Sequence, residues 1–187
     1  MMLLEVKPMF VPLLLMMIVA PLGAIDLIYY HGFKFKLYDR KDSYLETVIH
    51  LIRGLLFSSG AFILLNYQPN GIWFWATGAI FVLDLANSIF DVSIEGRSRK
   101  TLGGIPTLEY IIHTIGSTFA GAITISYFIL GWHFRLIPTS LSPLADGTYS
   151  KMFLGNGFAL VIGGIILTTI EAILLCKSII KYRSESH

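Results

Sequence analysis

Five long apolar runs account for most of the sequence, and each is bounded by charged or turn-forming residues. Each run is about twenty residues or longer, which is the length a helix needs to cross roughly 30 Å of hydrocarbon. The runs are continuous instead of alternating with polar residues, which argues against a transmembrane β-barrel. We therefore predict an all-α, polytopic transmembrane helix bundle, a single domain over residues 1–187, with spans at about 8–31, 44–67, 71–95, 107–134 and 152–180.

Composition supports this class and narrows the chemistry. The chain is 55% hydrophobic and 14% charged, with a mean hydropathy of +0.69, which excludes a soluble domain. A net charge of +2 is too small to indicate nucleic-acid binding. Cys176 is the only cysteine, so neither an internal disulfide nor a thiolate metal cluster can form. Any metal ion must be bound through nitrogen and oxygen.

The basic residues predict the orientation. With five spans, the two basic linkers and the C-terminal tail share one side of the membrane, and they carry ten Lys and Arg residues. The opposite side carries three, Lys7, Arg135 and Lys151. Basic residues concentrate on the cytoplasmic side, so we predict an inner (plasma) membrane protein with its N-terminus outside and its C-terminus in the cytoplasm. The ten are Lys34, Lys36, Arg40, Lys41, Arg97, Arg99, Lys100, Lys177, Lys181 and Arg183.

Acidic residues occur where a membrane span should have none. An intramembrane carboxylate is costly unless it is protonated, paired or bound to a cation. Histidines accompany them: Glu46 precedes His50 by four residues and Glu109 precedes His113 by four, which puts each pair on one helical face. Seven of the twelve acids lie within or at the edges of the spans, namely Asp26, Glu46, Asp84, Asp91, Glu95, Glu109 and Glu171.

Depth in the membrane brings these residues together. Counted from the predicted cytoplasmic boundary at 1.5 Å per residue, the acids and histidines of four spans fall into two adjacent layers. We therefore expect a metal site in the cytoplasmic half of the bundle, with Arg53 and Tyr110 beside the ligands. The expected ligands are Asp26, His31, Glu46, His50, Asp84, Asp91, Glu95, Glu109 and His113.

A structural explanation stays open for several of these residues. Glu46 follows Ser43 in a capping-box pattern, and Glu109 suits the first turn of a helix. Asp91 and Glu95 lie at a helix C-terminal end, where the dipole disfavours negative charge, so they need a cation. Arg53, Arg97 or Arg99 could supply it in a purely ionic network, which is the alternative to a metal.

Carboxylates and histidines without cysteine suit iron, manganese or zinc, and the ligand number suits two ions. The segments 46–50, 91–95 and 109–113 resemble the carboxylate-bridged di-metal helix bundles of the ferritin-like class, although the Glu–His spacing here is one residue longer. The stretch EGRSRKTLGGIPTLEYIIHT also resembles a family of small, uncharacterised bacterial polytopic membrane proteins, and that resemblance implies no activity.

The first hypothesis for function is a membrane-embedded di-metal oxidoreductase. Two iron or manganese ions would act on a lipid-soluble or small substrate from within the bilayer. A separate donor would supply the electrons, and nucleic acid would have no role. The alternatives are a zinc-dependent membrane hydrolase and a non-enzymatic metal-binding or transport protein. Transport is disfavoured because the outer halves of the predicted helices hold no acidic residue.

Overall fold

The computed structural model describes residues 9–185, and most of them are helical. Five helical stretches are long and apolar enough to cross a membrane, which confirms the predicted all-α class and the number of spans. Lys7 and Pro8, used above for orientation and for the start of the first span, lie outside the described residues. The helices are α1 (Phe10–Ile25), α2 (Tyr44–Asn66), α3 (Ile72–Ser98), α4 (Thr107–Gly131) and α5 (Lys151–Ser184).

Shorter elements connect and extend these helices. The first helix continues directly into a π-helical segment, and the third ends three residues later than the predicted span. Two short strands, which the sequence did not predict, pair with each other in antiparallel fashion. These elements are η1 (Asp26–Lys34), η2 (Leu37–Asp39), η3 (Lys41–Ser43), β1 (Tyr67–Asn70), η4 (Lys100–Leu102), η5 (Trp132–Leu136) and β2 (Ser140–Pro143).

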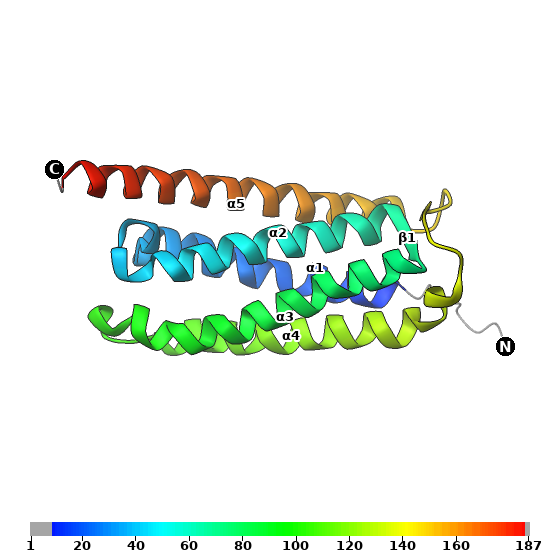
Figure 1. Cartoon of the computed structure of the whole chain (residues 1–187), viewed down its shortest axis with the longest axis horizontal. Coiled ribbons are helices and arrows are strands. Elements are labelled where there is room, and N and C mark those ends of the chain that lie inside the picture. The colour runs from blue at the N-terminus through cyan, green and yellow to red at the C-terminus, as the bar shows by residue number, and fades with distance from the viewer. Residues whose placement is uncertain (1–8, 186–187) are drawn as a thin grey trace.

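The helices run side by side along one long axis (Figure 1). α5 packs on α2, α2 on α3, α3 on α4 and α4 on α1, and α1 also contacts α5, so the five helices enclose a common interior. The C-terminus of the chain lies at one end of the bundle and the strand pair at the other (Figure 1). We call these ends the C-terminal end and the strand end.

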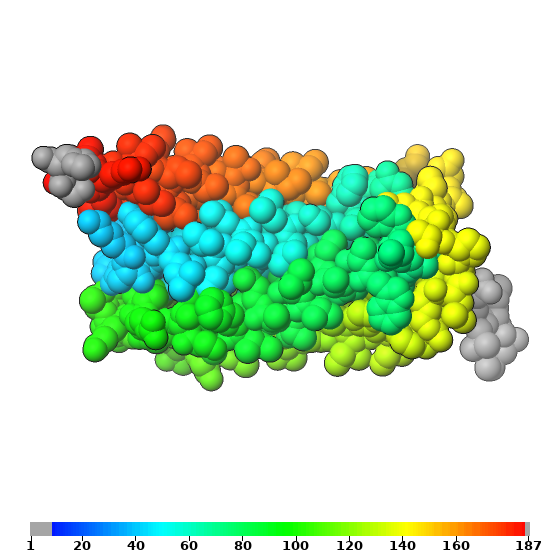
Figure 2. Space-filling view, in the orientation of Figure 1, coloured from blue at the N-terminus to red at the C-terminus, as the bar shows by residue number. Residues whose placement is uncertain are grey.

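The interior of the strand end is apolar. Phe74 and Tyr127 stack with ring centroids 5.0 Å apart, and the Tyr127 hydroxyl donates to the Phe74 carbonyl at 2.8 Å. β1 pairs with β2 from Tyr67 opposite Pro143 to Asn70 opposite Ser140, and Figure 2 shows this region covering the end of the bundle. The buried charged residues lie toward the C-terminal end.

Candidate metal centre

Eight buried or nearly buried residues form a carboxylate–histidine cluster inside the C-terminal half of the bundle. They come from four elements, with two residues from each of η1, α2, α3 and α4. Seven of them are at most 6% exposed, and the His50 side chain is 9% exposed. The cluster consists of Asp26, His31, Glu46, His50, Asp91, Glu95, Glu109 and His113.

Ordinary α-helix geometry explains why both members of three of the four pairs reach the cluster. The two members of each pair on α2, α3 and α4 are four residues apart, which places both on one face of an α-helix. Asp26 and His31 are five residues apart, and in an α-helix this spacing would separate them by about 140° around the axis. The π-helical hydrogen bonding of η1 adds residues to each turn and brings the two side chains to the same side.

Three imidazoles occupy the middle of the cluster. The His31 ring lies 4.1 Å from the His50 ring and 6.1 Å from the His113 ring, measured between centroids. Around them, His113 Nε2 lies 2.8 Å from Asp26 Oδ2, and His50 Nε2 lies 3.2 Å from Asp91 Oδ2. His113 Nδ1 contacts Glu95 on its other side.

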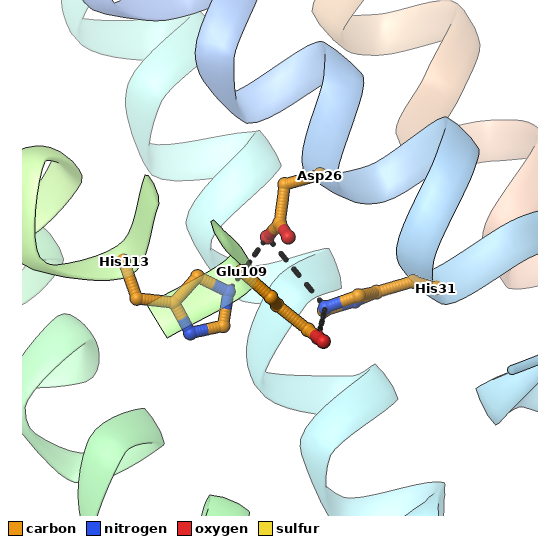
Figure 3. A group of neighbouring side chains, drawn as sticks. All are labelled: Asp26, His31, Glu109 and His113. Carbon is orange, nitrogen blue, oxygen red and sulfur yellow. Dashed lines mark hydrogen bonds and ion pairs between the residues drawn. The ribbon is translucent and has the colours of Figure 1, made fainter. Parts of the chain in front are cut away.

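Figure 3 shows how four of these side chains converge. Asp26 and His31 point from η1 toward Glu109 and His113 of α4, with His31 Nε2 3.5 Å from Asp26 Oδ2 and 3.6 Å from Glu109 Oε1. Carboxylate oxygens and imidazole nitrogens from two separate elements therefore lie close together.

The spacing of the ligand atoms fits metal ions. With metal–ligand bonds of about 2.0–2.2 Å, two ligand atoms on opposite sides of one ion are roughly 4 Å apart. Three groups of cluster residues each offer ligand atoms that all lie within 4.8 Å of one another. The groups are Asp26, His31, Glu109 and His113; His31, Glu46 and His50; and Asp91, Glu95 and His113.

Several ligand atoms of the cluster also lack partners. Among the described residues, no hydrogen bond reaches Asp26 Oδ1, Asp91 Oδ1 or Glu109 Oε2, although all three atoms are buried. His31 Nδ1 is buried and unpartnered in the same way. A buried polar atom without a partner is costly, and these atoms are of types that could bind a metal ion.

Arg99 is the cation that the structure places inside the cluster. Its side chain is fully buried, with Nη2 2.9 Å from Glu46 Oε1 and in contact with Glu109. Nη2 also lies 3.3 Å from His31 Nε2, and the guanidinium stacks 4.8 Å from the centre of the Phe35 ring. Arg99, counted above among the basic residues of the linker and also named as a possible counter-charge for the buried acids, turns its side chain back into the bundle and has the second of these positions.

Arg53 and Asp84 pair with each other outside the three groups. Arg53 Nε lies 3.8 Å from Asp84 Oδ1, about one turn from His50 toward the strand end. Arg53 was expected beside the ligands and was one of three candidate counter-charges; it lines the same cavity as Asp26, His50 and His113, whereas Arg99 is the arginine paired with cluster carboxylates. Asp84, expected as a ligand, is absent from every group of the described residues that could hold an ion.

Two further residues belong to none of the three ligand groups. Tyr110, expected beside the ligands, is 57% exposed on the outer surface of α4, because it is rotated about 100° from Glu109. The expectation for Tyr110 was therefore wrong. Glu171 is buried on α5, and its Oε2 has no hydrogen-bond partner among residues 9–185.

Comparisons with protein-family models, with curated proteins and with solved structures found no match for this chain. The function proposed below therefore rests on the residues of this chain and on their arrangement.

Proposed function

We propose that this chain is an intramembrane metalloprotein whose carboxylate–histidine cluster binds two divalent metal ions. The observation that carries the proposal is the buried convergence of ligand atoms within 4.8 Å of one another. Charge supports the number of ions. The cluster holds five carboxylates against the single Arg99 guanidinium, so its net charge is −4 when all five are ionised and the histidines are neutral. Two divalent ions bring this buried charge to zero.

For two ions we assign the ligands to two neighbouring sets based on two of the three groups; the third group, His31, Glu46 and His50, shares His31 with the first. Asp26, His31, Glu109 and His113 offer one ion two carboxylates and two imidazoles. Asp91 and Glu95 offer the second ion its carboxylates, with His50 Nε2 3.2 Å from Asp91 Oδ2. His113 stands between the sets, since its Nε2 faces Asp26 and its Nδ1 faces Glu95.

Iron or manganese suits this donor set best. Zinc sites that acidify water rely mainly on neutral imidazoles, whereas carboxylate-rich sites favour harder ions. Negatively charged ligands also stabilise the higher oxidation states that redox chemistry needs. We therefore infer an oxidoreductase that acts on a lipid-soluble substrate and receives electrons from a separate donor, with the zinc-dependent hydrolase as the alternative.

The orientation in the membrane is part of the proposal. With Arg99 buried, nine basic residues remain on the linkers and tail of the C-terminal end, against three on the opposite side. This asymmetry still favours a cytoplasmic C-terminus and an external N-terminus. The metal centre then lies in the cytoplasmic half of the bundle, where an electron donor in the cytoplasm can approach it.

Elemental analysis of protein purified without added metal tests the proposal. We expect about two iron or manganese ions per chain, and we expect His113→Ala to lose metal because its ring faces both ligand sets. His133→Ala is the matched control, since His133 is exposed near the strand end and should leave the metal content unchanged. Two zinc ions would favour the hydrolase, and no metal would leave an ionic network centred on Arg99.

A second measurement separates redox from hydrolytic function. After anaerobic loading with ferrous iron, exposure to air should oxidise both ions, consume oxygen and produce near-ultraviolet absorption from ligand-to-iron charge transfer. Protein that takes up only zinc, consumes no oxygen and gains no such absorption would contradict the oxidoreductase.

A further inference from the structure

A cavity of about 1060 Å³ lies in the bundle beside the cluster. Its walls are formed mainly by apolar residues of α1, α2, α4 and α5. At one end it is lined by the cluster residues Asp26, His50 and His113, and at the other by Tyr149 and its neighbours in the segment before α5. The cavity therefore extends from the candidate metal centre toward the strand end.

The dimensions of the cavity favour a chain-like molecule. Residues of α1 and of the start of η1 line it from Phe10 to Leu27, a length of about 25 Å at the rise of a helix. An elongated space with mainly apolar walls suits a hydrocarbon chain.

Glycines keep the space open. Gly23 and Gly163 line the cavity from opposite helices, and a Cβ atom added at either would meet no other atom within 4 Å. Leu14 and Ile18 of α1 line it too and are 37% and 51% exposed, so the cavity has a lateral opening along α1. A molecule dissolved in the bilayer can enter by this route.

Arg53 gives the cavity a positive charge next to the cluster. It is the single arginine or lysine among the described residues that line the cavity, and its side chain is 24% exposed. Its ion pair with Asp84 is loose at 3.8 Å, which leaves most of the five guanidinium N–H donors for another acceptor. A guanidinium binds a carboxylate through two parallel hydrogen bonds.

The opposite end of the cavity has no comparable charge. Tyr149 is buried there, and burial raises the pKa of its hydroxyl to about 12, so the group stays neutral. Its hydroxyl faces the Leu64 carbonyl at 3.5 Å. The cavity thus has the Arg53 guanidinium at the end that Asp26 and Asp84 also line, and a neutral end at Tyr149.

We propose that the cavity binds a long-chain carboxylic acid, with its carboxylate on Arg53 and its hydrocarbon chain directed toward Tyr149. The carboxyl end and the adjacent carbons then lie nearest the metal centre. This ligand would be the substrate class of the proposed oxidoreductase, and that role as a substrate rests on the proposed function. The binding of the acid requires only the cavity and Arg53.

Saturable binding of radiolabelled palmitic acid to the detergent-solubilised protein tests the carboxylate contact. The double variant Arg53→Gln/Asp84→Asn removes both charges of the pair together, so that no buried carboxylate is left alone. We expect it to weaken palmitate binding about ten-fold or more and to leave the binding of methyl palmitate unchanged. Arg53→Lys, which keeps the charge, should recover part of the loss.

A matched pair of glycine variants tests the position of the chain. Gly163→Phe places a ring in the cavity, whereas Gly155→Phe lies two turns away on the same helix, outside the cavity lining and also in open space. Gly163→Phe should abolish saturable binding of palmitate, and Gly155→Phe should preserve it. Both variants should unfold at similar temperatures, which separates loss of the cavity from loss of the fold.

Two results would overturn the inference. One is that palmitate, methyl palmitate and a prenylated quinone bind equally tightly and that the Arg53 variants do not alter this binding. The site would then select apolar chains alone. The other is unchanged palmitate binding in Gly163→Phe. The metal content is measured on the same samples, so palmitate binding without metal would contradict the proposed function and leave this inference standing, and metal without palmitate binding would do the reverse.

Discussion

Arg99 balances part of the charge of the cluster from within the protein. Its guanidinium contacts Glu46 and Glu109 and approaches His31, while Ser98 donates a further hydrogen bond to Glu46. These contacts engage one oxygen of Glu109 and leave Oε2 unpartnered among the described residues. Arg99 can therefore orient two carboxylates and still leave donor atoms for a metal ion.

Replacing Arg99 with methionine should destabilise the protein strongly. The apolar side chain leaves Glu46 and Glu109 buried without their counter-charge, and breaking a buried ion pair in this way costs about 3–5 kcal/mol. Thermal unfolding in detergent measures the loss. Arg97→Met is the control, because Arg97 is exposed in the last turn of α3, two residues before Arg99, and should change stability by less than about 0.5 kcal/mol. Equal losses in the two variants would contradict a central role for Arg99.

The residue-scale predictions succeeded where spacing alone decides the geometry. Glu109 and His113 share a helical face at any rotation of α4, so their proximity follows from the sequence. The rotation of a membrane helix is harder to predict, because lipid-facing and packed positions are both apolar. Tyr110 could nevertheless have been placed correctly, since it directly follows Glu109. The sequence named Arg99 as one of three possible counter-charges but could not select it, because its burial depends on α3 continuing to Ser98.

At the scale of elements, the π-helical geometry of η1 determines whether the first membrane span contributes one ligand or two. Asp26 and His31 both reach the cluster because η1 departs from α-helical hydrogen bonding. The depth argument placed both residues near the correct level, since the rise along the axis is similar for any helix. It could not supply their common direction, because π-helical turns are rare and depend on packing around the segment.

The strand pair depends on the close approach of two backbones. Gly71 follows β1 with φ of +58°, and a Cβ atom there would lie 2.8 Å from Thr139 Cα and 2.9 Å from Thr139 N. Its own N–H donates to the Phe134 carbonyl at 2.9 Å. Gly147 also has a positive φ, of +77°, but a Cβ atom there would meet nothing within 4 Å.

Gly71→Ala should therefore destabilise the protein more than Gly147→Ala. Both substitutions force alanine into an unfavourable conformation, at a cost of about 1–2 kcal/mol, and only the first also pushes one backbone against another. We expect a loss of about 3 kcal/mol for Gly71→Ala, measured by unfolding in detergent. Its metal content per folded chain should be unchanged, because the strand pair and the cluster lie at opposite ends. Indistinguishable unfolding of the two variants would show that the backbone contact is unimportant.

On the scale of the whole molecule, the two halves of the bundle have different interiors. Aromatic and aliphatic side chains fill the strand end, and charged ligand-type side chains fill the C-terminal half. The sequence predicted this asymmetry, because no acid falls in the outer half of a predicted span. It did not predict the cavity, which arises from how α1 and α5 pack and not from any local pattern.

Orientation in the membrane is the remaining property of the whole molecule, and cysteine labelling tests it. In a Cys176→Ser background, Asp146→Cys and Lys100→Cys each place one exposed thiol at opposite ends of the bundle. The excess of basic residues at the C-terminal end predicts that this end is cytoplasmic. A membrane-impermeant maleimide added to intact cells should therefore label Asp146→Cys and should label Lys100→Cys only after lysis.

The pattern of labelling distinguishes the ways in which this prediction can fail. If Lys100→Cys reacts in intact cells and Asp146→Cys does not, the bundle is inserted with the opposite orientation, and the metal centre then lies nearer the external face. An electron donor would have to approach it from that side. If both thiols react from outside, the two ends share one side of the membrane, which contradicts five spans. The expected pattern alone places the cluster within reach of cytoplasmic electron donors while its cavity stays open to the lipid.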